Sequence, residues 1–169
     1  MPRAARLNFV RQQGFKDADT STCPLQYPAL MFQPRLLGVL VLVGLVTQAW
    51  PLFLILSAVL WWNVVLPAWN PFDILYHYFV AAPAGRPRVM PAPSPRRFAQ
   101  GMAGTFLLAA GLFLLLGWSA PAFVAEAFLV VAIAALVFGK FCLGSYLFHL
   151  LRGERAFAQR TLPWSRQDR

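Results

Sequence analysis

Every Lys and Arg of this 169-residue chain lies in one of three blocks, and the long apolar stretches between the blocks contain none. The blocks cover residues 3–35, 86–97 and 140–169, and together they hold all 15 basic residues. In membrane proteins the cytoplasmic loops collect Lys and Arg, whereas translocated loops do not. The pattern therefore predicts a multi-pass membrane protein whose two termini and middle loop all lie in the cytoplasm. It does not predict a reaction.

The composition supports a membrane class and argues against nucleic acid as a partner. Charged residues make up 12% of the chain and hydrophobic residues 59%, whereas soluble domains carry about a quarter charged residues. The net charge of +9 is not arranged as a basic patch with interleaved aromatic residues. Membrane orientation and contact with anionic lipids explain it better. We expect membrane lipids as partners and the inner (plasma) membrane as the location.

The apolar runs predict an all-α fold of four transmembrane helices, arranged as two hairpins. The first hairpin covers 36–67 with a turn near Trp50, and the second begins at 97 and ends with a long fourth helix at 121–151. A spanning helix needs about 20 apolar residues, and both arms of the first hairpin are short. A re-entrant hairpin is therefore the alternative for residues 36–67.

Three segments follow from this layout. We expect a cytoplasmic N-terminal tail at 1–29, a membrane domain at 30–151 and a basic cytoplasmic tail at 152–169. Within the first tail, the pairs Cys23-Pro24 and Tyr27-Pro28 disfavour regular helix. Within the membrane domain, residues 70–95 should form a cytoplasmic interfacial helix followed by a Pro-rich loop.

The interfacial helix has a clear start signal. Asn70 can cap it, Pro71 suits the first helical position, and Asp73 is favourable in the first turn. The structural role is preferred over ligand binding by these residues. Asp73 can also pair with Arg96 or Arg97, which would tie the interfacial helix to the second hairpin.

A stripe of residues spaced by three or four positions runs along the predicted fourth helix: Ala132, Ala135, Gly139, Cys142, Tyr146 and His149. Small residues on one face let helices approach closely, so a packing seam is the preferred interpretation. Gly101, Gly104 and Gly111 of the third helix are expected to pack against it. The alternative makes Cys142 a reactive thiol, with His149 two turns away and Lys140 favouring the thiolate.

Two further groups are candidates for binding lipid or another ligand. Arg96 and Arg97 begin a helix, where a lipid phosphate would offset their unfavourable position against the helix dipole. Trp61, Trp62 and Asn63 lie inside an apolar run. They either pack between helices or line a groove for a lipid, quinone or pigment. No cofactor is identified, and the spacing of the two His and two Cys residues matches no metal-site pattern.

Three short motifs carry a resemblance to a known family: NPFD at Asn70–Asp73, PRRFAQ at Pro95–Gln100 and FCLGSYLF at Phe141–Phe148. Over residues 24–151 the chain resembles an uncharacterised bacterial family of small membrane proteins, domain of unknown function 4395. The resemblance implies a four-helix inner-membrane fold. Many members look to carry a C-x-G-C pair, which suggests thiol or sulfur handling. Here Cys142 matches the first cysteine and Ser145 replaces the second, so only a pairing of Cys23 with Cys142 would restore a dithiol.

The function predicted from these features is non-enzymatic. We expect a structural or accessory subunit that packs against other membrane proteins, because the chain combines many aromatic residues, glycine seams and long basic ends. A thiol- or sulfur-linked protein that uses Cys142 is the alternative. A small transporter is weaker, because the helices offer only Asn63, Thr105 and Glu126 for a polar path.

Overall fold

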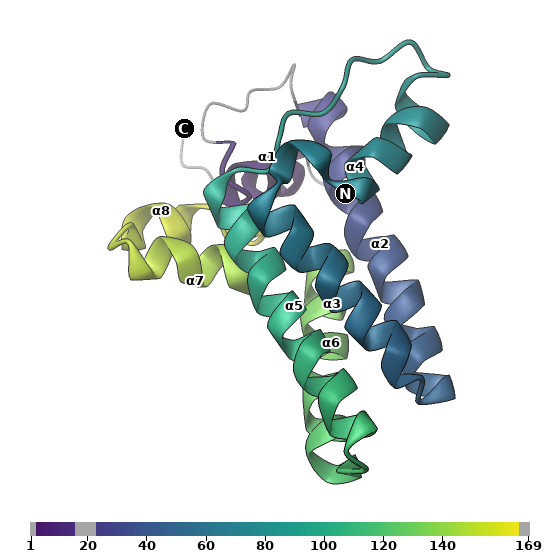
Figure 1. The fold of residues 1–169 in the computed structure, drawn as a ribbon. Helices are drawn as coiled ribbons and strands as arrows, with labels where there is room; N and C mark the ends of the chain where they lie inside the picture. The colour runs from purple at the N-terminus through teal and green to yellow at the C-terminus, as the bar shows by residue number, and fades with distance from the viewer. Residues whose placement is uncertain (1–2, 16–22, 166–169) are drawn as a thin grey trace.

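The computed structural model describes residues 3–15 and 23–165, and all regular structure in these ranges is helical (Figure 1). The main helices are α2 (Cys23–Thr47), α3 (Trp50–Val65), α5 (Ser94–Leu115) and α6 (Ser119–Val137). The turns after α2 and α5 lie at the same end of the bundle, so the two predicted hairpins point the same way. We call this the far end, and the opposite end, which carries the basic residues of α1 and of the start of α5, the basic end.

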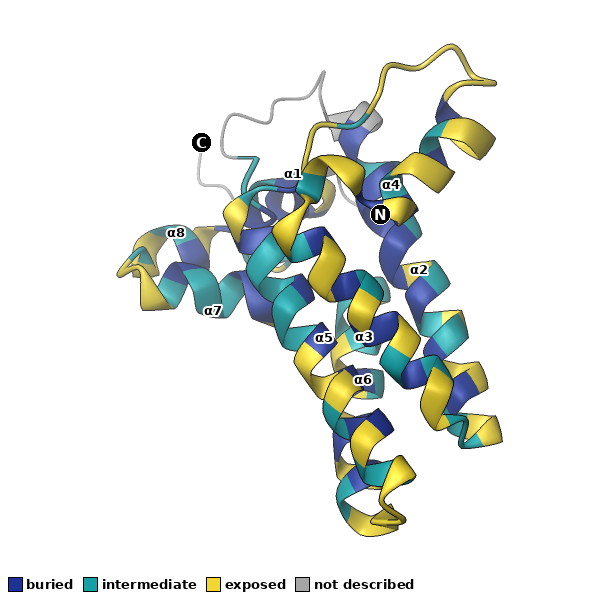
Figure 2. Ribbon diagram, in the orientation of Figure 1, coloured by how far each residue is buried: buried dark blue, intermediate teal, exposed yellow. Residues whose placement is uncertain are grey.

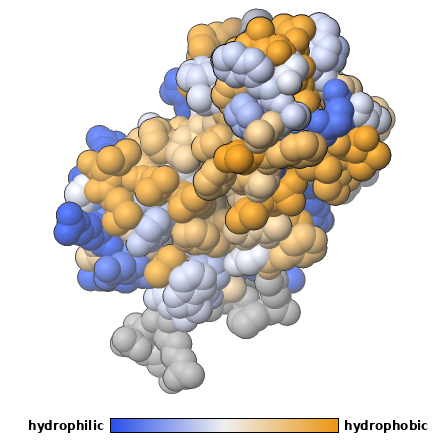
Figure 3. Space-filling model, turned by 90° about the horizontal axis from the view of Figure 1, so that it is seen from below, coloured by the Kyte–Doolittle hydropathy of each residue, from blue (hydrophilic) through white to orange (hydrophobic). Residues whose placement is uncertain are grey.

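Three of these helices are long and apolar enough to cross a membrane: Gln26–Thr47 of α2, α5 and α6. Helix α3 is apolar but has 16 residues, which gives a length of about 24 Å against the about 30 Å of a hydrocarbon core. Exposed apolar residues cover the outer faces of the bundle (Figure 2). Seen from the far end, apolar side chains form most of the surface (Figure 3).

The N-terminal part of α2 corrects the prediction that Cys23-Pro24 and Tyr27-Pro28 disfavour helix. Helix α2 begins at Cys23 and includes both Pro28 and Pro34. Residues between these prolines, Ala29, Leu30 and Met31, are buried, so tertiary packing outweighs the hydrogen bonds that proline removes. The expected tail also contains α1 (Arg3–Gln12), which packs Phe9 and Val10 against α2 and Cys142.

The predicted continuous fourth helix is wrong: the chain breaks into α6 and α7 (Leu143–Leu151). At the break, Lys140 adopts a left-handed conformation with φ of 56°. The Phe141 N–H donates to the Ala135 carbonyl, and the Lys140 ammonium donates to the Val137 carbonyl. Helix α7 then leaves the bundle and is followed by α8 (Arg155–Arg160) (Figure 1). The stripe from Ala132 to His149 is therefore not one helical face.

The glycines of α5 also pack differently from the prediction. A Cβ on Gly104 would lie 3.1 Å from Trp61 Cδ1, and one on Gly111 would lie 2.7 Å from Leu54 Cδ2. Both neighbours belong to α3, and Ser57 of α3 donates a hydrogen bond to the Gly104 carbonyl at 2.7 Å. The glycine face thus brings α5 against α3, while other residues of α5 contact α6.

A helix forms where the sequence predicts the interfacial helix. Helix α4 (Pro71–Tyr76) follows the short 3₁₀ turn η1 (Pro67–Trp69) and continues into one π-helical turn, η2 (His77–Ala81). The Asn70 side chain accepts a hydrogen bond from the Phe72 N–H at 3.0 Å, which confirms the cap. The residues after η2 loop back across the basic end to Ser94 (Figure 1).

Candidate functional site

A buried ion pair joins α4 to α5 at the basic end. The Arg96 guanidinium donates to both Asp73 carboxylate oxygens, at 2.8 and 3.1 Å. The two side chains are 5% and 15% exposed, so neither charge is well solvated and each needs the other. This confirms the predicted pairing of Asp73 with an arginine of the next hairpin.

Gln33 of α2 completes this network. Its side-chain oxygen accepts from Arg96 Nη2 at 2.8 Å and from Gln100 Nε2 at 2.9 Å. Because a guanidinium can only donate, the Gln33 oxygen must face Arg96, and this fixes the orientation of the Gln100 amide as well. The network therefore ties α2, α4 and α5 together through charge-assisted hydrogen bonds.

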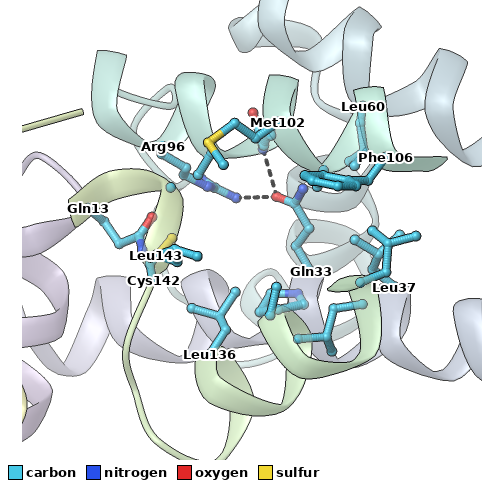
Figure 4. Close-up of a pocket in the computed structure, with 18 of the residues that line it drawn as sticks. Gln13, Gln33, Leu37, Leu60, Arg96, Met102, Phe106, Leu136, Cys142 and Leu143 are labelled. Carbon is cyan, nitrogen blue, oxygen red and sulfur yellow. Dashed lines mark hydrogen bonds between the residues drawn. The ribbon is translucent and has the colours of Figure 1, made fainter. Parts of the chain in front are cut away.

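A cavity of about 250 Å³ lies beside this network, between α2, α5, α6 and the start of α7 (Figure 4). Its walls are mostly apolar, and polar side chains gather at one end: Gln13, Gln33, Arg96, Gln100 and Cys142. Figure 4 shows the Gln33 amide pointing into the cavity, with its oxygen toward Arg96 and its nitrogen toward Phe106.

The cavity opens to the outer surface between α5 and α6. Phe106 of α5 and Phe128 of α6 line it and are 36% and 59% exposed. Their rings lie 5.7 Å apart between centroids. Ala132 and Leu143, which also line the cavity, are exposed as well. The opening therefore faces sideways, toward the medium that surrounds the apolar helices.

Cys142 lines the cavity but is not paired with His149. Cys142 is buried, and its N–H donates to the Gln12 side-chain oxygen at 3.1 Å. The buried His149 ring places Nδ1 2.6 Å from a Glu154 carboxylate oxygen and Nε2 3.2 Å from the Gln12 carbonyl. Gln12 of α1 thus contacts residues at both ends of α7, through its side chain at the start and its backbone carbonyl at the end. The Cys23 side chain lies outside the described residues, so pairing of Cys23 with Cys142 stays a prediction.

Lys140 is directed inward at the break between α6 and α7. It is 6% exposed, and this burial lowers the pKa of its ammonium, which the nearby positive charges of Arg35 and Arg6 lower further. Its hydrogen bond to the Val137 carbonyl closes the end of α6. The described geometry gives Lys140 a role in ending a helix, and the proposal that it favours a Cys142 thiolate stays a prediction.

The predicted ligand-binding residues separate into different places. Arg96 is directed into the bundle, whereas Arg97 Nε donates to the Val64 carbonyl at 2.8 Å. Arg97 and Trp61 line a surface groove of about 450 Å³ between α3 and α5. Trp62 is exposed, and Asn63 is fully buried with neither side-chain atom hydrogen-bonded among the described residues.

The remaining predicted residues play local structural roles. Gly139 lies where α6 ends, and an added Cβ would come within 2.7 Å of the Ala135 carbonyl oxygen. The Tyr146 ring packs on Phe141 with centroids 5.5 Å apart. Asn63, Thr105 and Glu126 do not meet: Thr105 faces the surface groove, and Glu126 accepts from Gln48 at the far end. They form no shared polar path within the described part of the chain.

Four buried glutamines of this region are not identifiable as site residues from the sequence. Gln12, Gln13, Gln33 and Gln100 are all buried at the basic end. A neutral amide carries no charge, and Gln33 lies next to Pro34 and Arg35 before the apolar run begins, so the sequence does not single it out. Its partners come from other helices, which the sequence alone does not place.

The three short motifs of the sequence meet around this cavity. Asn70 and Asp73 contribute hydrogen bonds to the network from the start of α4, and Arg96 and Gln100 contribute hydrogen bonds from α5. Gly144 of α7 packs directly on Ala99, and Ser145 donates to the Pro95 carbonyl at 3.3 Å. The sequence segments most characteristic of the chain thus build one site.

Comparisons with known proteins identify the family of the chain. No curated protein and no solved structure matches the chain. One family matches residues 28–153, which is well over half of the chain and includes all three motifs. The protein therefore belongs to the family described as "Domain of unknown function (DUF4395)".

Proposed function

We propose that the protein is a non-enzymatic integral membrane protein that binds a lipid-soluble amphiphile in the cavity between α2, α5, α6 and α7. The amphiphile belongs to the class of lipids, quinones or pigments. The basic end lies on the cytoplasmic side of the inner membrane, as the positive-inside rule favours. The cavity is the observation that supports this proposal, because it has apolar walls and a few fixed polar groups, as small-molecule sites do.

The shape and chemistry of the cavity support an amphiphile rather than a polar metabolite. Small-molecule pockets usually measure about 300–1,000 Å³, so about 250 Å³ suits one ring or a short length of chain. The Gln33 amide nitrogen and the Cys142 thiol offer weak polar contacts to a small head group. The lateral opening beside Phe106 and Phe128 lets the rest of the molecule extend into the bilayer.

A cavity-filling variant tests this proposal. We expect Ala132→Phe to reduce the amount of copurified amphiphile by about fivefold or more, because the new ring occupies the mouth of the cavity. Ala127→Phe is the matched control, since Ala127 is an exposed residue of the same helix and does not line the cavity. The measurement is mass spectrometry of organic extracts from protein purified in native lipid particles. Equal amounts of every extracted compound in both variants would contradict the proposal.

A second proposal, association with other membrane-protein subunits, is favoured by a cluster of exposed aromatic residues near the basic end of α3. These are Trp61, Trp62, Trp69, Tyr78 and Phe79. Interfaces are enriched in such residues. We expect a photo-crosslinking amino acid at Phe79 to capture a second protein in native membranes. The same probe at Phe123, exposed on α6, should capture none. Equal capture at both positions, or none at either, would argue against this surface as an interface.

A further inference from the structure

A small pocket at the basic end lies apart from the amphiphile cavity. It forms where the loop after η2 folds back onto the start of α2 and onto α4 (Figure 1). Its polar lining consists of Gln26, Tyr76, Arg86 and Arg88, and its volume is about 40 Å³. None of the described residues lines both this pocket and the amphiphile cavity.

Two buried polar atoms of this pocket have no hydrogen-bond partner among the described residues: the Tyr76 hydroxyl and the Gln26 side-chain oxygen. Tyr76 is 3% exposed and Gln26 is 8% exposed. Burying a polar atom without a partner costs free energy, so native structures almost always satisfy such atoms. A group bound in this pocket would give both atoms a hydrogen-bond partner.

The chemistry of the lining favours an anion. Arg86 and Arg88 contribute positive charge and only donate hydrogen bonds, and the Tyr76 hydroxyl can donate as well. The Gln26 amide can turn to present its NH₂ group, because the nitrogen and oxygen positions of an amide are assigned and not observed. None of the described residues that line the pocket is acidic.

The volume and the surroundings favour a phosphate group carried by a lipid. A single water needs about 10–15 Å³ of such volume, so the pocket has room for a group of several heavy atoms. Tyr78 and Phe79 of the adjoining η2 turn are 62% and 74% exposed. Of these two, tyrosine is a residue type enriched at the level of lipid headgroups. Lysine and arginine clusters beside such residues attract anionic lipids.

We propose that Tyr76, Gln26, Arg86 and Arg88 bind the phosphate of an anionic membrane lipid. The site would hold the loop after η2 against α2 and α4, because its residues come from all three segments. The arginines supply charge-assisted hydrogen bonds to the phosphate oxygens, and Tyr76 and Gln26 supply neutral ones. This site is independent of the amphiphile cavity, so Ala132→Phe should leave it unchanged.

The test uses full-length protein, stripped of lipid in a maltoside detergent, and measures thermal unfolding while short-chain phosphatidylglycerol is added. We expect the lipid to raise the unfolding temperature of the wild type, and a phosphate-free diacylglycerol not to do so. Tyr76→Phe and Arg88→Gln should each weaken the apparent affinity for phosphatidylglycerol about tenfold. Arg155→Gln, an equal charge change at an exposed residue of α8, should change it less than twofold.

Tyr76→Phe also gives a signature that a purely structural role would not produce. Without lipid, removing a buried hydroxyl that has no partner among the described residues should keep or raise the unfolding temperature. With phosphatidylglycerol, the unfolding temperature of the variant should be lower than that of the wild type. Equal effects of diacylglycerol and phosphatidylglycerol, or equal responses of Arg88→Gln and the wild type, would overturn the phosphate site. Equal stabilisation by glycerol phosphate at the same concentration would overturn the assignment to a lipid.

Discussion

Asp73→Asn is expected to lower the free energy of unfolding by about 3 kcal/mol. The asparagine keeps the shape of the carboxylate but leaves the Arg96 guanidinium, whose side chain is 5% exposed, without a counter-charge. Breaking a buried ion pair at one partner costs about 3–5 kcal/mol. The lower value applies here because the asparagine oxygen can still accept one hydrogen bond. Unfolding of detergent-solubilised protein, followed by tryptophan fluorescence, measures the change.

Two variants show whether the loss comes from the buried charge. Arg97→Gln changes the neighbouring arginine, which is half-buried and donates to a backbone carbonyl, and should cost less than about 1 kcal/mol. Adding Arg96→Met to Asp73→Asn removes the uncompensated charge and should recover at least half of the loss. A loss for Asp73→Asn no larger than that for Arg97→Gln would show that Arg96 finds solvent or another partner.

The parts of the fold that depend on local signals could be predicted from the sequence. The cap at Asn70 and the pairing of Asp73 with an arginine follow from neighbouring residues or from charge. The orientation of the two turns follows from the distribution of basic residues. Each of these signals involves either one helical turn or the strong cost of burying a charge alone.

The parts that depend on packing between distant segments could not be predicted. Helix α2 continues through its prolines because residues of α1 and Cys142 pack against its Leu30 and Met31. The break after α6 lies inside an apolar run, and only the pair Gly139-Lys140, a usual end signal for a helix, marked it. The hydrophobic periodicity and the composition of a segment do not distinguish one straight helix from two helices that bury the same residues.

In the candidate site, too, local signals could be predicted from the sequence and contacts between distant segments could not. The sequence identifies Arg96 as a candidate, but its inward direction depends on Gln33, which lies 63 positions away in the sequence. The sequence also places Cys142 in a motif, but its position in a cavity wall depends on the turn after α6. A sequence of this kind identifies the residues of a polar cluster more readily than it identifies their partners.

Gly144→Ala is expected to lower the free energy of unfolding by about 2–3 kcal/mol, because it forces α7 away from α5. An added Cβ would lie 2.6 Å from Ala99 Cα and 2.7 Å from Ala99 Cβ. The first of these is a backbone atom, so no side-chain rotation relieves the collision. Ala99→Gly should therefore fail to rescue the variant, because the Cα remains in place.

The matched control is Gly101→Ala on α5, where the added Cβ would make an ordinary contact 3.6 Å from Val64 Cγ2. Alanine favours helix over glycine by about 1 kcal/mol, so this control should be neutral or stabilising. Movement of α7 should also expose Cys142, which lies at its start. In a Cys23→Ser background, Gly144→Ala should then speed maleimide labelling of Cys142 at least fivefold, and Gly101→Ala should leave the rate unchanged. Unchanged stability and labelling in Gly144→Ala would mean that α5 and α7 are less closely packed than this contact requires.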